Sequence, residues 1–467
     1  MSDSDDHDSR NATAANAEDV AGQSCDPDAV VVTGVGVVSS LGIGADAFWE
    51  GMCAGNGGLQ QYLIRGETPV APDGDGDQDP LLGCPVIDFQ PKQLVKPRKA
   101  LKVMSRELQT SFAASSLALD DADIRDYLTD RTQIPADRIG TVYGSEMLYG
   151  APSELTDAVR GCQSADGTID ASMFGGVAKK QVMPLWMLKY LPNMAACHAG
   201  IAVDARGPNN TIVVGDTSAM AALIESHSCI CRGIADVMMT GSTGSRVNET
   251  RRVYRGDQLW PIDVSDSNLS AGDSPQLFAQ PDAASGMIPG EGAVTLVLES
   301  KIHCQRRQRQ PIAEIRGVAN RMNAKDPAQA IAAAGAHALH AAGLSVNDIG
   351  LVVSHAFGDP TEDAAEARAL SQLFAGADAD RSTALLAPAA ALGHCGAASA
   401  GLGMATALMA IRHGQVPMTI GQQAEVPPSL SDTPLRFAES VQPLHGAVLC
   451  IAHGRQGTAT AMVLSQP

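Results

Sequence analysis

Residues 207–220 have the sequence GPNNTIVVGDTSAM. The run that ends at Val214 is rich in β-branched residues and predicts a strand, and Gly215 permits a sharp turn after it. The residues that follow predict a helix that lasts to about Arg232. We therefore expect Asp216 on a turn above the sheet, close to the free N–H groups of a helix N-terminus. That geometry would favour the thiolate of a cysteine, but with aspartate in its place such covalent chemistry is not available.

The composition excludes several classes of protein. A chain of 467 residues with 45% hydrophobic content can bury a large core. No apolar run reaches the roughly 18 residues of a membrane span, and a formal net charge of −19 argues against nucleic-acid binding. Residues 1–27 are polar and acidic, so we expect a disordered tail that lacks a signal-peptide core. The 10 cysteines have irregular spacing, which is typical of reduced thiols and predicts a cytoplasmic protein.

Runs with β propensity alternate with alanine-rich helices along the whole chain, which predicts an α/β fold. We divide the chain into an N-terminal half at 28–305 and a C-terminal half at 306–467. The first half is expected to contain strands at 30–38, 235–242 and 293–298 and a loop-rich insertion at 66–80. For the second half we expect strands at about 312–318 and 349–354 and helices at 327–342, after Thr361 and at 398–413.

Several short motifs follow one another in a characteristic order. They are VVTGVGVVS at 31–39, GPN at 207–209, ADVMMTGS at 235–242, GEGA at 290–293, His355 followed by Pro360, Asp363 and Glu366, and Gly393-His394 followed by Ala397 and Ala398. Together they resemble the β-ketoacyl synthases of the thiolase-like superfamily, which condense acyl and malonyl units on acyl carrier protein. The resemblance implies a thiolase-like fold, in which two similar halves form a five-layered α-β-α-β-α arrangement.

The resemblance also implies where the active site lies. In these enzymes a cysteine at the elbow holds the acyl chain, and two histidines promote decarboxylation of the malonyl unit and steady the enolate oxygen. Asp216 occupies the cysteine position, and His355 and His394 occupy the histidine positions. We take these three as the candidate catalytic residues.

Two further positions depart from the family pattern. The family has a lysine five residues before the second histidine, where this chain has Ala389. The C-terminal motif Phe-Gly-Phe-Gly-Gly-Thr-Asn is replaced by HGRQGTA at 453–459, with Arg455 at the second phenylalanine. Departures that cluster at one site in an otherwise retained scaffold indicate a changed role.

The candidate residues also have structural interpretations. Asp216 can serve as the N-cap of the following helix, since aspartate is among the preferred N-cap residues. His355 and His394 can be retained for hydrogen bonding inside a packed core. Cys395 is adjacent to His394, but the motif alignment directs its thiol away from the elbow.

We expect neither a cofactor nor a metal ion. The stretch GVGVVS at 34–39 lacks the third glycine of a dinucleotide-binding motif. Cys229 and Cys231 do not have a usual metal-ligand spacing. The resemblance implies instead that substrates arrive on the phosphopantetheine arm of acyl carrier protein.

One basic stretch stands out against the acidic background, at the start of a helix that we expect to continue to Leu119. It comprises Lys92, Lys96, Arg98, Lys99, Lys102 and Arg106. It can be a solvated helix face or a docking patch for an acidic partner. Because acyl carrier proteins are strongly acidic, the resemblance favours the docking patch. It also implies a homodimer or a heterodimer with a ketosynthase.

Two functions remain open, beside ordinary condensation through another nucleophile, which the loss of three expected site groups argues against. The first is a non-condensing subunit similar to the chain-length factors of type II polyketide synthases, which lack the cysteine and pair with an active ketosynthase. Typical chain-length factors have also lost both histidines, whereas this chain keeps His355 and His394. The second is an enzyme that acts on acyl or malonyl thioesters, with the histidines polarising the carbonyl and Asp216 as a general base. An ionised Asp216 would, however, repel a malonyl carboxylate.

Overall fold

The computed structural model describes residues 30–73, 79–248, 250–251, 277–278, 286–378, 380–420 and 426–467. The tail predicted at 1–27 and part of the insertion at 66–80 lie outside these ranges.

The strands are β1 (Val30–Ser39), β2 (Gly42–Ile43), β3 (Gln60–Arg65), β4 (Thr68–Val70), β5 (Leu81–Gly83), β6 (Ile139–Gly144), β7 (Asn209–Ile212), β8 (Val237–Ser245), β9 (Glu291–Ser300), β10 (Ala313–Met322), β11 (Ile349–Val353), β12 (Thr383–Leu386), β13 (Gln415–Val416), β14 (Leu435–Phe437), β15 (Gln442–Pro443), β16 (Ala447–Gly454) and β17 (Thr458–Ser465). The α-helices are α1 (Ala45–Cys53), α2 (Pro91–Leu94), α3 (Arg106–Asp121), α4 (Arg125–Thr129), α5 (Ser153–Arg160), α6 (Phe174–Gln181), α7 (Met194–Ala202), α8 (Ser218–Cys231), α10 (Lys301–Arg306), α11 (Pro327–Ala342), α12 (Pro360–Leu373), α13 (Ala389–Leu392) and α14 (Ser399–His413). Short 3-10 turns used below are η1 (Arg98–Val103), η5 (Gly215–Thr217) and η8 (Gly396–Ala398).

The main sheet has the strand order β14-β12-β11-β16-β17-β10-β1-β9-β8-β6-β7. This order is nearly symmetric about the antiparallel pair β1 and β10, where Val31 lies opposite Glu314. On one side β6 is parallel to both β7 and β8, and on the other side β11 is parallel to both β12 and β16. The strand order therefore displays a duplication of the fold that is not visible in the sequence.

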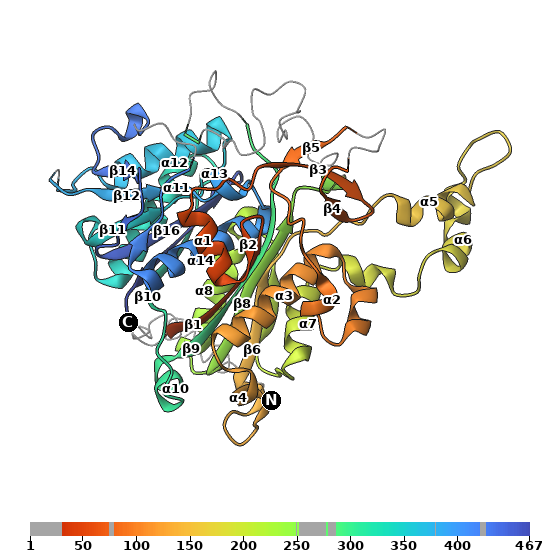
Figure 1. Cartoon of the computed structure of the whole chain (residues 1–467), viewed down its shortest axis with the longest axis horizontal. Helices are drawn as coiled ribbons and strands as arrows, with labels where there is room; N and C mark the ends of the chain where they lie inside the picture. The colour runs from red at the N-terminus through yellow and green to blue at the C-terminus, as the bar shows by residue number, and fades with distance from the viewer. Residues whose placement is uncertain are drawn as a thin grey trace, which may run out of the picture.

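Helices cover both halves of the sheet and fill the space between them (Figure 1). Helices α8 and α14 pack against each other and against strands of both halves, while α3 and α7 cover the outer face of the first half. Helices α11 and α12 cover the outer face of the second half. The residues of α14 from Ala400 to Ile411 are all buried, as expected for a central helix that is apolar on every side. The predicted five-layered thiolase-like α/β fold is confirmed.

The glycines of the VVTGVGVVS stretch have a packing role. Helix α3 crosses β1 so closely that a Cβ on Gly36 would lie 2.1 Å from the carbonyl oxygen of Ala114. Gly34 meets the carbonyl oxygen of Ala118 at 2.4 Å in the same way. The glycines are therefore needed for close approach of a helix to a strand.

The element predictions are largely confirmed. The helix expected at 327–342 has those bounds, and the strand expected at 30–38 extends by one residue to Ser39. The insertion at 66–80 was predicted to be loop-rich, but it contributes β4, which pairs with β3. Eight of the cysteines predicted to be reduced are free thiols in the structure, but Cys231 is disulfide-bonded, so the prediction that all the cysteines are reduced is wrong. Within the described ranges no helix has both the length and the apolar character that a membrane crossing requires.

Candidate functional site

In the first half, three adjacent parallel strands end at the same edge of the sheet, and a charged residue follows each of them. Glu146 comes after β6, Asp216 after β7 and Arg246 after β8. The Arg246 side chain forms a buried ion pair with Glu146, and its Nη2 lies 3.9 Å from Oδ1 of Asp216. The carboxyl ends of parallel strands are a common place for functional groups.

In the second half, the corresponding strands place three imidazoles at the equivalent edge. His355 follows β11, and His394 follows β12 after the short helix α13. His453 lies near the end of β16. The two edges face the same region of the molecule, because imidazoles of the second half lie beside Asp216 of the first half.

Asp216 lies on the turn between β7 and α8, as predicted. Gly215 has a φ of +72°, a conformation that favours glycine. Thr217, and not Asp216, is the N-cap residue of α8, and no side chain caps that helix. The prediction that Asp216 caps the helix is therefore wrong. Its carboxylate is instead turned toward His394 and Arg246, where opposite charge is available.

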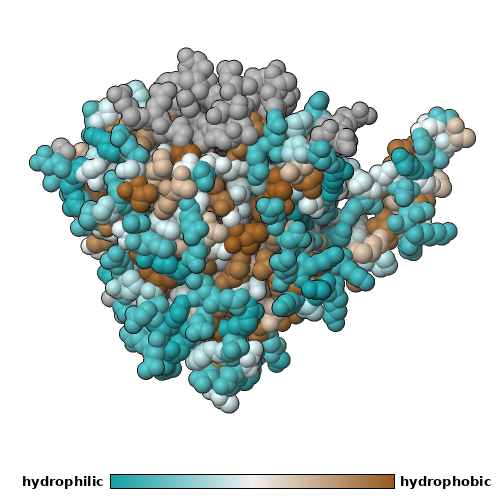
Figure 2. Space-filling view, viewed as in Figure 1, coloured by the Kyte–Doolittle hydropathy of each residue, from teal (hydrophilic) through white to brown (hydrophobic). Residues whose placement is uncertain are grey.

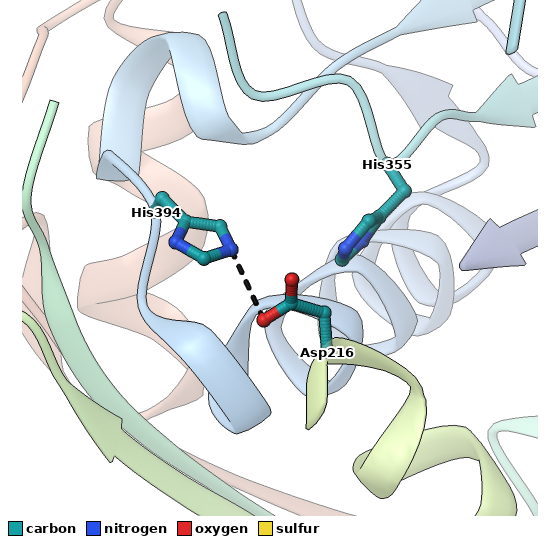
Figure 3. A group of neighbouring side chains, drawn as sticks. All are labelled: Asp216, His355 and His394. Atoms are coloured by element: carbon teal, nitrogen blue, oxygen red, sulfur yellow. Dashed lines mark ion pairs between the residues drawn. The ribbon is translucent and has the colours of Figure 1, made fainter. Parts of the chain in front are cut away.

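The structure brings Asp216, His355 and His394 together (Figure 3). One ligand atom from each residue lies within 4.8 Å of the others. His394 Nε2 is 3.2 Å from Oδ1 of Asp216. His355 and His394 are 5% and 1% exposed, while the Asp216 side chain is 17% exposed. Two buried imidazoles thus converge on a carboxylate that lies closest to solvent.

Carboxylates of α12 hold the loop that carries His355. The backbone N–H of His355 donates to Oε1 of Glu366 at 3.1 Å. The backbone N–H groups of Phe357 and Gly358 donate to the two oxygens of Asp363 at 3.0 and 3.1 Å. Glu366 and Asp363 are the acidic residues of the first histidine motif. Their spacing after His355 lets both carboxylates accept hydrogen bonds from the loop that carries this histidine.

His394 is held by backbone contacts on both sides. Its N–H donates to the carbonyl of Ile288 at 2.7 Å, and its own carbonyl accepts from the N–H of Gly290 at 3.0 Å. Gly393 has a φ of +66°, so the sharp turn before the histidine requires a glycine. The ring of Phe357 lies beside that of His394, with 4.6 Å between centroids. The imidazole therefore has a defined orientation toward Asp216.

The cluster favours an ionised Asp216 and a neutral His355. Burial opposes ionisation of Asp216, but His394, Arg246 and His355 outweigh it and hold the pKa of Asp216 well below its usual range. Burial, together with the charge of His453, lowers the pKa of His355 to about 3. At neutral pH the site accordingly contains an aspartate anion beside a neutral His355.

Residues 27–303 match the family described as Beta-ketoacyl synthase, N-terminal domain, and residues 312–423 match Beta-ketoacyl synthase, C-terminal domain. The chain belongs to the β-ketoacyl synthase family. It is similar to the tetracenomycin polyketide synthase ketoacyl synthase alpha subunit of Streptomyces glaucescens, with 25% identity over 94% of this chain and 97% of the relative. The 3-oxoacyl-[acyl-carrier-protein] synthase 2 of Coxiella burnetii is 25% identical over 94% of this chain and 98% of its own length.

Solved structures show the same fold. The structure described as the ishigamide ketosynthase/chain length factor matches with a TM-score of 0.74 and 22% identity, covering 94% of this chain and 99% of that chain. A β-ketoacyl synthase from Burkholderia phymatum matches with a TM-score of 0.74 and 21% identity, over 94% of this chain and 100% of that chain.

The structure explains what replaces the first phenylalanine of the β-ketoacyl synthase C-terminal motif. His453 is buried between two carboxylates of α12, with Nε2 at 3.0 Å from Glu366 and Nδ1 at 3.4 Å from Glu362. Burial opposes protonation, but these carboxylates raise the pKa of His453 to about 10. Its ring centroid is 5.2 Å from that of His355. His453 is therefore an imidazolium that belongs to the site. The sequence alone had not decided whether His453 lies there.

Arg455 has a different surrounding. Its side chain is 34% exposed and forms an ion pair with Asp359, the N-cap residue of α12. The arginine at the position of the second family phenylalanine thus contacts the start of the helix that carries Glu362 and Glu366.

Cys395 and Ala389, the two other positions that the sequence left open, have clear outcomes. The Cys395 thiol donates to the carbonyl of Leu392 at 3.5 Å, and burial raises its pKa, which disfavours the reactive thiolate. Ala389, at the lysine position, lines a cavity beside His355 with a volume of about 10 Å³. That is about the space that one water molecule needs.

Sequence reasoning missed Arg246, Glu146 and Glu362. The signal that could have found Glu146 and Arg246 was a charged residue within two positions of the end of a buried strand. Glu362 and Glu366 are four residues apart and thus on one face of α12. Arg106 was assigned to the exposed basic stretch, but it is buried and paired with Glu291 at 2.7 Å, which corrects that assignment.

Proposed function

We propose that this protein is a non-condensing subunit that pairs with an active ketosynthase in fatty acid or polyketide biosynthesis. The observation that carries the proposal is the ionised Asp216 at the turn where a condensing enzyme has its cysteine. Asp216 is ionised and lies 3.2 Å from His394 and 3.9 Å from Arg246. A carboxylate in this position lies within ion-pair distance of the histidine that a condensing enzyme would use on its substrate.

The described residues around the elbow supply no replacement thiol. Among the described cysteines, Cys395 is the one beside His394, and it is fully buried with a thiol that favours its protonated form. Condensation through a thioester on the protein is thus disfavoured, as in the chain-length factors that this chain resembles.

The edge of the first half supports pairing with a second subunit. Within the part of the chain that the structure describes, β7 is a terminal strand of the sheet, so one side of it carries backbone groups without a neighbouring strand. Beside it lie Val213 and Val214, which are 44% and 41% exposed, and Ile201, which is 76% exposed. Open strand edges and exposed apolar patches are features of surfaces that a partner covers.

A projecting segment extends the same surface. The residues between β6 and α7, which include α5 and α6, extend away from the body (Figure 1). Hydrophobic residues gather along this segment in the space-filling view (Figure 2). Its exposed large apolar residues include Val159, Ile169, Met173, Met183, Leu185 and Met187. A segment of this kind can wrap around a partner subunit.

An acyl carrier protein is the proposed second partner. Lys92, Lys96, Arg98, Lys99 and Lys102 are exposed on α2, on η1 and between them. The sequence predicted that these residues form the first turns of the helix, but α3 begins after them, at Arg106. A structure with the same fold shows a type II polyketide synthase acyl-carrier protein in complex with its ketosynthase, with 20% identity and a TM-score of 0.73.

Co-expression tests the pairing. The full chain is produced alone and together with a ketosynthase encoded beside its gene, and native mass spectrometry reports the assemblies. We expect a one-to-one heterodimer in which the ketosynthase condenses acyl units. A chain that remains a homodimer in the presence of that ketosynthase contradicts the proposal.

A second candidate is an enzyme that acts on acyl or malonyl thioesters through Asp216, His355 and His394. It is favoured by the Nε2 atom of His355, which is buried and has no hydrogen-bond partner among the described residues. Intact-mass analysis of malonyl- and acyl-loaded carrier protein, mixed with this chain alone, tests it. Loss of carbon dioxide or release of the acyl group, abolished by Asp216→Ala or His355→Ala, would establish the enzyme. No change over hours would leave the subunit role.

A further inference from the structure

We propose that Asp216, His355 and His394 form a binding site for a divalent transition-metal ion such as Zn²⁺ or Fe²⁺. The three residues come from segments far apart in the sequence, and each presents one donor atom to the same point (Figure 3). Two imidazole nitrogens and one carboxylate oxygen are a ligand set that suits these ions.

The separations fit a metal site. With metal–ligand bonds of about 2.0–2.2 Å, neighbouring ligand atoms lie roughly 3.0–3.4 Å apart. His394 Nε2 and Asp216 Oδ1 are already 3.2 Å apart, and no pair in the set exceeds 4.8 Å. His355 would therefore need to move inward by at most about 1.5 Å, which is within reach of a side-chain rotation.

The donor atoms are also free to bind. Nε2 of His355 and both ring nitrogens of His394 are buried without a hydrogen-bond partner among the described residues. The contact of His394 with Asp216 is an ion-pair distance that lacks hydrogen-bond alignment. Buried polar atoms without partners are costly, and a bound cation would satisfy both imidazoles at once.

The surrounding charges permit a cation. Arg246 is the nearest positive group, but it is paired with Glu146, which also has Arg251 at 3.4 Å. His453 lies between Glu362 and Glu366. Counting these groups with Asp216 leaves four carboxylates against three cations, so the site is not positive as a whole.

The remaining contacts resemble the support that metal ligands need. Glu366 holds the backbone of His355, and Phe357 packs against the rings of both histidines. Support of this kind orients ligands before the ion arrives. Asp216 is 17% exposed on its side chain, which gives the ion a route from solvent. Three protein ligands would leave positions open, as in catalytic rather than closed structural sites.

The test uses the full chain without a histidine tag, stripped of metal and titrated with Co²⁺. We expect one Co²⁺ per chain, with visible d–d absorption, and displacement by Zn²⁺. Asp216→Asn and His355→Gln should each weaken binding by more than about 100-fold, since even supporting residues cost 10–100-fold. His340→Gln, on an exposed histidine of α11, is the control and should bind as the wild type does.

Thermal unfolding keeps the test informative if one variant folds poorly. Zn²⁺ should raise the Tm of the wild type and of His340→Gln, and should not raise that of His355→Gln. Absence of the d–d band, or Co²⁺ affinity that is unchanged in both Asp216→Asn and His355→Gln, overturns the proposal. Loss of binding in His340→Gln alone would assign the ion to the surface and would overturn it as well.

Discussion

The two halves of the molecule share one strand order but differ at the edge strand and in the residues that follow their parallel strands. Among the described residues, β7 is the terminal strand of the first half, whereas in the second half the equivalent strand β12 pairs with an additional strand, β14, which is the terminal strand there. The first half places charged residues at its strand ends, and the second half places imidazoles there. The two ends of the sheet therefore present different edge strands, β7 in the first half and the additional strand β14 in the second.

The largest expected effect comes from the open edge. Val214→Asp places a charge on the surface beside β7 and should weaken dimer formation by more than about 100-fold, because a buried unpaired charge costs about 3–5 kcal/mol. Light scattering after size-exclusion chromatography, over a dilution series, measures the assembly. Arg436→Asp, on an exposed position of β14, is the matched control at the opposite edge of the sheet and should leave the assembly unchanged. Equal effects at both edges would contradict the proposed pairing surface.

The next comparison concerns the charges at the two sets of strand ends. His453→Phe leaves Glu362 and Glu366 without their cation, so the free energy of unfolding should fall by about 3–5 kcal/mol. Arg246→Met should cost less, about 1–2 kcal/mol, because Glu146 keeps Arg251. Urea denaturation measures both, and adding Glu366→Gln to His453→Phe should recover part of the loss. Similar losses for the two single variants would refute this ranking.

Glu107 in the first half and Asp363 in the second differ in their hydrogen bonds, although burial raises the pKa of both carboxyl groups to about 7. Burial raises the pKa of Glu107 to about 7 from an ordinary 4.5, and its Oε1 has no hydrogen-bond partner among the described residues. Because the folded pKa is the higher one, the stabilising contribution is largest below pH 4.5 and is lost as the pH rises toward 7. Glu107→Gln should therefore stabilise the protein at pH 8 by about 2–3 kcal/mol and flatten the decline between these pH values.

In the second half, Asp363 accepts from three backbone N–H groups, those of Phe278, Phe357 and Gly358. Asp363→Asn replaces one acceptor oxygen by a donor, so it should destabilise the protein by about 1–3 kcal/mol. Unfolding curves at several pH values measure both variants. A stabilising Asp363→Asn, or a Glu107→Gln that leaves the pH dependence unchanged, would show that the hydrogen-bond environments do not decide the difference.

The smallest effect is expected at the basic surface of the first half, around α2 and η1. Lys96→Glu combined with Lys99→Glu should weaken binding of an acyl carrier protein several-fold, since exposed charges contribute about 0.2–1 kcal/mol each. The loss of affinity should be smaller at high salt, because salt screens the attraction between the lysines and the acidic carrier protein. Lys325→Glu, on an exposed position of the second half, is the control. Calorimetric titration with the carrier protein distinguishes a docking surface from a merely solvated one.

Most of the fold was predictable because its signals are local. Apolar runs marked the buried strands, and alanine-rich stretches with capping residues marked helices such as 327–342. The elbow at Asp216 was predictable from a strand, a glycine and a helix in succession. The positions of His355 and His394 followed from their motifs, and the structure places both beside Asp216.

The remaining features depend on which segments become neighbours. Asp216 was expected to cap α8, a local role, but tertiary structure offered its carboxylate a histidine and an arginine instead. Arg106 lies in a basic stretch of the sequence, yet it is buried because Glu291 from β9 meets it. In the same way, His453 becomes a charged group only between two carboxylates of α12.

The sequence by itself determined the order of the elements, the aspartate at the elbow and the two motif histidines, because turns, helices and strands depend on nearby residues. Only the tertiary structure decided the ionised state of Asp216, the pairing of His453 and the open edge of β7. Charge and burial act through space, so they follow from the packing of segments that are distant in the chain.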